Sequence, residues 1–218
     1  MNALCEMVFI LDRSGSMHGL EADTIGGFNS MIQEQRTKNV NAMITVALFD
    51  DRLDIPFQRE SLDKIPEMTD EIYFTRGCTA LFDAVGTMIT QVTSHRRHLA
   101  PAEMPEKTVF VITTDGYENA SREWSGSALK RLIEQKQEEG WEFLYLGANI
   151  DASVEAEKIG IRAERAVRYH NDSTGVRNNY ATVGHALVDF ACSAPSAPMS
   201  DSWSAEIEKD FRSRKSSR

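Results

Sequence analysis

The fold is decided by the stretch Met7-Val8-Phe9-Ile10-Leu11, which runs directly into Asp12-Arg13-Ser14-Gly15-Ser16-Met17. A short, continuous apolar run of this kind is typical of a parallel strand buried on both faces. The Ser- and Gly-rich segment after it predicts a loop, because these residues favour turns over strands. A buried strand that ends in polar groups indicates a parallel sheet with function at the carboxyl ends of its strands.

The rest of the chain alternates apolar runs with segments of helical periodicity, which is the pattern of an α/β fold. Residues 53–57 can return as an antiparallel strand, and Pro56 places it at a sheet edge because proline cannot donate to a ladder. The other predicted strands are 7–11, 43–49, 107–113, 141–146 and 166–169, and the predicted helices contain 25–32, 81–92, 124–133, 154–159 and 180–190. We predict a doubly wound, mostly parallel, Rossmann-like sheet with one antiparallel edge strand and helices on both faces.

The length of 218 residues fits one domain and a tail. The composition shifts after Cys192 to a Ser/Ala/Pro segment and then to a polar end. Such a segment is typical of a linker. We therefore place the domain at residues 1–192 and a polar, loosely held linker and tail at residues 193–218. The alternative is that Trp203, Ile207 and Phe211, which lie at helical spacing, dock on the domain.

Charge and cysteine usage limit the classes of partner. The formal net charge is −9, which disfavours binding to nucleic acid or an anionic membrane surface. The three cysteines are far apart and form no C-x-x-C pair, as expected in a reducing compartment. No basic, apolar leader opens the sequence, and the longest apolar run is far too short to span a membrane. We expect a cytoplasmic protein with no nucleic-acid or membrane partner.

Three short segments at strand or helix ends carry the candidate chemistry. They are residues 12–17 after the first strand, residues 77–81 before the helix at 81–92, and residues 113–116 after the strand at 107–113. Loops at the carboxyl ends of parallel strands meet where the strand order reverses, so these segments can converge. Their oxygen donors are Asp12, Ser14, Ser16, Thr79 and Asp115. Such hard donors, without His or Cys, suit Mg²⁺ or Mn²⁺, with Ca²⁺ as a third option, and disfavour zinc and copper.

Asp12-x-Ser14-x-Ser16, Thr79 and Asp115-Gly116 together resemble the metal-ion-dependent adhesion site (MIDAS) of von Willebrand factor type A (vWA) domains. The resemblance spans roughly Leu4 to Cys192, and it extends to bacterial stand-alone members through residues 114–119 and 146–149. It implies that the serines and the threonine lie in or next to the metal's ligand sphere, with the aspartates bound directly or through water. It also implies a module that binds a protein partner through an acidic residue and has no enzymatic activity.

Other interpretations remain open for the separate motifs. Thr79 alone can be a helix cap and Asp115-Gly116 alone can be a turn. The rival function is a haloacid-dehalogenase-like Mg²⁺-dependent phosphotransferase, which also places an aspartate after its first strand. That family needs a second carboxylate two residues later, where this chain has Ser14. A P-loop enzyme is excluded because no G-x-x-x-x-G-K-[ST] motif occurs. A vestigial metal site is a third reading, against which the complete donor set argues.

Overall fold

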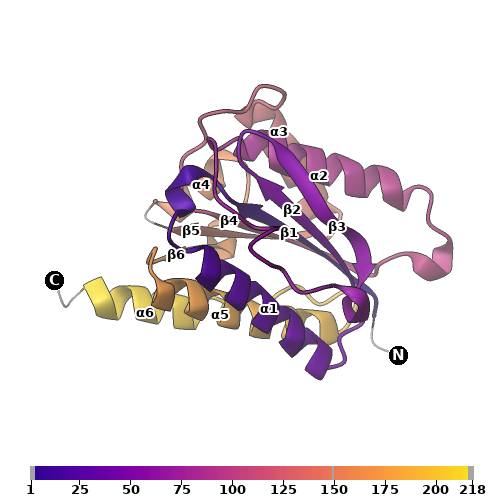
Figure 1. Ribbon diagram of the computed structural model, residues 1–218. Helices are drawn as coiled ribbons and strands as arrows, with labels where there is room; N and C mark the ends of the chain where they lie inside the picture. Colours follow the sequence, from indigo (N-terminus) through magenta and orange to yellow (C-terminus); the bar gives the residue numbers. More distant parts are fainter. Residues whose placement is uncertain (1–2, 149, 216–218) are drawn as a thin grey trace.

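The computed structural model describes residues 3–148 and 150–215, so Asn149 and the tail end at 216–218 lie outside the described residues. Six strands form one sheet in the order β3-β2-β1-β4-β5-β6 (Figure 1). The strands are β1 (Cys5–Asp12), β2 (Ala42–Phe49), β3 (Leu53–Ser61), β4 (Lys107–Thr114), β5 (Glu142–Ala148) and β6 (Ala166–Tyr169). The α-helices are α1 (Glu21–Thr37), α2 (Leu81–Arg96), α3 (Gly126–Glu138), α4 (Ala152–Lys158), α5 (Ser173–Cys192) and α6 (Ala205–Lys215).

The predicted sheet topology is confirmed. All neighbouring strands pair in parallel except β2 and β3, and β3, which contains Pro56, is an edge strand. From β1 the chain builds outward through β2 to β3 and then returns to add β4, β5 and β6 on the other side. The strand order therefore reverses between β1 and β4, which places the loops after these two strands next to each other.

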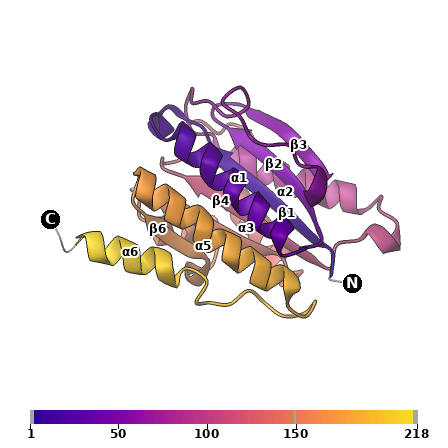
Figure 2. The ribbon, with the colours of Figure 1, turned by 60° about the horizontal axis from the view of Figure 1, so that its bottom comes forward.

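Two apolar layers hold the helices against the sheet. Along β1, Met7 and Phe9 belong to the core under α1 and α5, whereas Val8 and Ile10 belong to the core under α2, α3 and α4. This alternation follows from the period of two of a strand, and both faces are apolar because both are covered. Figures 1 and 2 show α1 and α5 side by side on one face of the sheet, with α6 beyond α5. Among the described residues, no helix is long and apolar enough to cross a membrane.

The segment after Cys192 differs from the expected loosely held tail. It contains α6, which packs beside β6 and α5 (Figure 2). Met199, Trp203 and Ile207 are buried and extend the core under α1 and α5. The physical reason is that these few apolar side chains pack against an apolar surface of the domain. The average composition of the segment is polar and therefore does not indicate this contact. The domain boundary at residue 192 stays a prediction.

Candidate metal centre

Asp12 lies at the carboxyl end of β1, next to the switch point. Its side chain is almost fully buried. One carboxylate oxygen accepts the Ser14 amide at 2.7 Å, and the other accepts the Thr114 hydroxyl at 2.6 Å. The Thr114 contact ties the end of β1 to the end of β4, so the two strands that flank the switch point hold this carboxylate in place.

Ser14 and Ser16 form the next part of the site. Their hydroxyl oxygens are 3.0 Å apart, and the Ser16 hydroxyl donates to Asp115 Oδ1 at 2.5 Å. Ser14 is buried and Ser16 is exposed. The loop after β1 therefore places both hydroxyls on one side, facing the carboxylate that follows β4, and the cluster opens to solvent at Ser16.

Thr79 approaches the same place from the segment before α2. A Cβ built on Gly116 would lie 3.1 Å from Thr79 Oγ1 and 3.6 Å from Ser16 Oγ. Because Gly116 has no side chain, the Thr79 and Ser16 hydroxyls can approach the backbone that follows Asp115. Thr79 is not the capping residue of α2: Ala80 occupies that position and Thr79 is buried. The structure therefore brings all five predicted donors to one edge of the sheet.

The loop after β1 is braced from the side away from the donors. Arg13, in the middle of the quoted motif, points to β3 and the β2–β3 turn, where its buried guanidinium binds Asp50 at 2.8 Å and also contacts Asp54. Its backbone carbonyl accepts the Arg76 amide at 2.8 Å. The buried Tyr73 hydroxyl donates to the Asp12 carbonyl at 2.6 Å. These contacts fix the backbone that carries Asp12, Ser14 and Ser16.

Both carboxylates lie where negative charge is poorly solvated. Burial raises the pKa of Asp12 to about 6, although the hydroxyl of Thr114 and the amide of Ser14 oppose the shift. Burial also raises the pKa of Asp115, opposed by Ser16 and Asn171. Within the described part of the chain, no Lys, Arg or His forms an ion pair with either group. Two buried acids with neutral hydrogen-bond donors form a site that a cation would stabilise.

The donor set fits a hard divalent cation. Two carboxylates and three hydroxyls are oxygen ligands of the kind that Mg²⁺, Mn²⁺ and Ca²⁺ take. Among the described residues, no three His, Cys, Asp or Glu side chains come together as a metal site. The hydroxyls of Ser14, Ser16 and Thr79 would therefore have to complete any cation site built on Asp12 and Asp115.

The sequence alone missed three residues of this site. Thr114 and Tyr73 hold Asp12, and Asn171, in the loop between β6 and α5, donates its amide Nδ2 to Asp115 Oδ2 at 2.9 Å. Asn171 also follows a strand at its carboxyl end, which is the signal that could have identified it. Asn119, four residues after Asp115, accepts the Thr79 amide at 3.0 Å and so holds the segment before α2.

The comparisons with known proteins agree with this geometry at the level of the fold. No family model matches the sequence, and the curated proteins contain no match. Proximal thread matrix protein 1 from the mussel byssus, in a structure with its MIDAS motif occupied by zinc, is 18% identical with a TM-score of 0.52, and the match covers 88% of this chain and 46% of that one. The ArnB paralog VWA2 from Sulfolobus acidocaldarius is 19% identical with a TM-score of 0.51, over 87% of this chain and 45% of that one.

A third neighbour matches over nearly its whole length. The vWF domain of the type V pili tip protein Mfa5 from Porphyromonas gingivalis is 7% identical with a TM-score of 0.62, over 92% of this chain and 99% of that one. The chain spans about half the length of the first two neighbours. These neighbours are vWA domain proteins, and the chain has the vWA fold, as its motifs predicted.

Proposed function

We propose that this chain is a divalent-cation-dependent protein-binding module that performs no bond chemistry. The observation that carries the proposal is the convergence of five oxygen donors at the switch point of the sheet, on an edge that opens to solvent at Ser16. The vWA fold, and the zinc in the MIDAS motif of one structural neighbour, support a metal at this position. A pili tip protein among the neighbours supports a role in binding.

Each donor has a role in this proposal. Ser14, Ser16 and Thr79 would hold the cation through hydroxyl oxygens, and Asp12 and Asp115 through carboxylates, directly or through water. Bound Mg²⁺ or Mn²⁺ would supply a Lewis-acidic position for an outside oxygen ligand. The buried hydrogen bonds from Thr114 and Ser14 orient Asp12 for this role, because a ligand held in one rotamer needs less ordering on binding.

The partner is proposed to be a protein that presents an acidic residue. Three of the five donors are neutral, and where both aspartates act through water the ion keeps strong Lewis acidity in its inner shell, which a further anionic oxygen can use. The net charge of −9 would repel an acidic partner at a distance. Attraction must therefore be local to the cation. The cytoplasmic location expected from the composition belongs to the same proposal and would be tested by cell fractionation.

The rival phosphotransferase is disfavoured by the position of Ser14. That family needs a second carboxylate at this position, but Ser14 contributes a hydroxyl 3.0 Å from Ser16 and its amide donates to Asp12. A serine hydroxyl cannot give up a proton near neutral pH as a carboxylic acid can. The proposal therefore assigns the site to recognition.

The metal part of the proposal is tested by melting the protein in Mg²⁺ and in chelator. A cation at a hundredfold excess over its Kd stabilises the folded state by about 2.7 kcal/mol. Ser14→Ala/Ser16→Ala should remove that difference. The matched control is Ser125→Ala/Ser127→Ala, an exposed serine pair with the same spacing in sequence and hydroxyls 3.2 Å apart. Loss of the Ser125 cap on α3 lowers both midpoints, but the difference between metal and chelator should remain. Equal melting midpoints of the wild type with and without metal, at millimolar Mg²⁺ and Mn²⁺, would contradict the proposal.

The partner part is tested with a displayed random-peptide library. Peptides that bind in Mg²⁺ and elute with chelator should be enriched in Asp or Glu, and the Ser14→Ala/Ser16→Ala variant should not retain them. Peptides that bind equally in chelator, or that lack an acidic residue, would show that recognition uses another face of the domain.

A further inference from the structure

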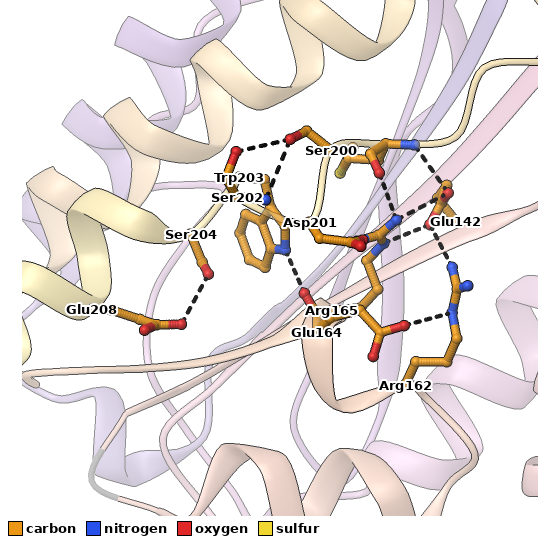
Figure 3. Close-up of polar contacts among 11 residues, drawn as sticks. Glu142, Arg162, Glu164, Arg165, Ser200, Asp201, Ser202, Trp203, Ser204 and Glu208 are labelled. Carbon is orange, nitrogen blue, oxygen red and sulfur yellow. Dashed lines mark hydrogen bonds and ion pairs between the residues drawn. The ribbon is translucent and has the colours of Figure 1, made fainter.

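The segment after Cys192 is anchored at two places, and the first lies beside the amino-terminal end of β5. The buried Arg165 guanidinium donates to Glu142 at 2.8 Å, to Asp201 at 2.7 Å and to the Met199 carbonyl at 2.7 Å. Figure 3 shows the side chains of Arg165, Glu142 and Asp201 close together. The Trp203 indole donates to the Glu164 carbonyl at 2.8 Å. This network fixes the chain just before α6 and sets the direction in which the helix leaves.

The second anchor lies near the other end of α6, against the loop between β6 and α5. Arg214 donates from one guanidinium nitrogen to both carboxylate oxygens of Asp172, at 2.9 and 2.7 Å. The ring of Phe211 stacks on His170 with centroids 4.5 Å apart, and the Phe211 carbonyl lies 3.2 Å from His170 Nε2. The helix therefore contacts the two residues on either side of Asn171.

Asn171 connects this loop to the metal centre. Its Nδ2 donates to Asp115 Oδ2 at 2.9 Å, while Ser16 donates to the other oxygen. The carboxylate can only accept, so it orients the amide with its nitrogen inward. The remaining Oδ1 of Asn171 is buried and has no hydrogen-bond partner among the described residues. Such an atom next to an oxygen-lined site marks an acceptor that a site water would satisfy.

We propose that Asn171 positions Asp115 for the cation and that α6 holds Asn171 in place, so that the segment after Cys192 is a structural part of the metal site. Asp172 also caps α5, accepting the Gly175 amide at 2.8 Å, so the loop is held from both of its neighbouring helices. Removing the contacts of α6 would leave the loop free to move Asn171 away from Asp115. This inference rests on the proposed metal-binding function.

The experiment measures Mg²⁺ and Mn²⁺ affinity of the full chain by calorimetry at 25 °C. Groups that orient a metal ligand change its affinity by about 10- to 100-fold when removed. Asn171→Ala should raise the Kd by about tenfold or more, and Arg214→Ala by a smaller factor of about three to ten because it acts through the loop. The matched control is Arg212→Ala: Arg212 lies on the same helix, is largely exposed and pairs within α6 with Glu208. It should bind metal as the wild type does.

Melting in chelator separates positioning from a merely structural role. A structural role for Arg214 would lower the melting midpoint without metal and leave the Kd of the folded protein unchanged, which would overturn the inference. Arg214→Lys, which keeps the charge, should give an intermediate Kd. Equal Kd values for the wild type, Asn171→Ala and Arg214→Ala would likewise overturn it while leaving the proposed function intact. A wild type that binds neither cation would overturn both.

Discussion

Replacing Trp203 with alanine tests whether the segment after Cys192 is bound to the domain. The side chain is 6% exposed, lies in the core under α1 and α5, and donates a hydrogen bond to the Glu164 carbonyl at 2.8 Å. Truncating a buried tryptophan to alanine destabilises proteins by about 3–5 kcal/mol. The lost hydrogen bond adds little to this range, because Glu164 is exposed and water can satisfy its carbonyl.

The expected change in melting midpoint follows from the size of the chain. An unfolding entropy of roughly 2.1 cal/mol/K per residue gives, for 218 residues, about 0.46 kcal/mol/K. A loss of about 4 kcal/mol then lowers the midpoint by about 9 °C. The loss cannot exceed the free energy that docks the segment, because beyond that point the segment would detach from a folded domain.

Differential scanning calorimetry in chelator measures this shift without any contribution from metal. Lys209→Ala is the control, since that side chain is 78% exposed and its ion pair with Glu206 lies at the surface. A chain that ends at Cys192 should lose at least as much stability as Trp203→Ala, because it also lacks Met199 and Ile207. If Trp203→Ala and Lys209→Ala melt within about 1 °C of each other, where about 9 °C is expected, the docking argument is refuted and the loosely held tail expected from the composition is right.

Two further predictions concern the chemistry of the site and a buried acid. Para-nitrophenyl phosphate should be turned over no faster by the wild type than by Asp12→Asn, because Ser14 replaces the needed acid; turnover that Asp12→Asn abolishes would favour the phosphotransferase. Burial raises the pKa of Glu6 above its ordinary value of 4.5. The stability that the protonated carboxyl contributes is therefore present below pH 4.5 and is lost as the pH rises through the raised pKa. Glu6→Gln should therefore match the wild type at pH 4 in urea denaturation and become the more stable protein towards pH 7; a pH-independent difference would contradict this.

The sequence alone determined the layers of the fold and the five oxygen donors that the structure brings together. β1 and β4 are buried on both faces, so each appears as an uninterrupted apolar run, and the polar residues that follow each run mark its end. Pro56 identified the edge strand because its ring excludes a donor from the ladder. The five donors follow from the same pattern, since each lies next to the end of a strand or the beginning of a helix.

The tertiary structure decided which distant residues support those donors. Asn171 reaches Asp115 from the loop after β6, two strands away in the sheet, and no local pattern specifies such a contact. Arg13 lies inside the motif, yet its side chain turns away to Asp50. The docking of α6 depends on Trp203 and Ile207 meeting an apolar surface made by distant segments. Hydrophobic periodicity indicates which side of a helix or strand is buried. The segments that pack against that side depend on the tertiary fold of the whole chain.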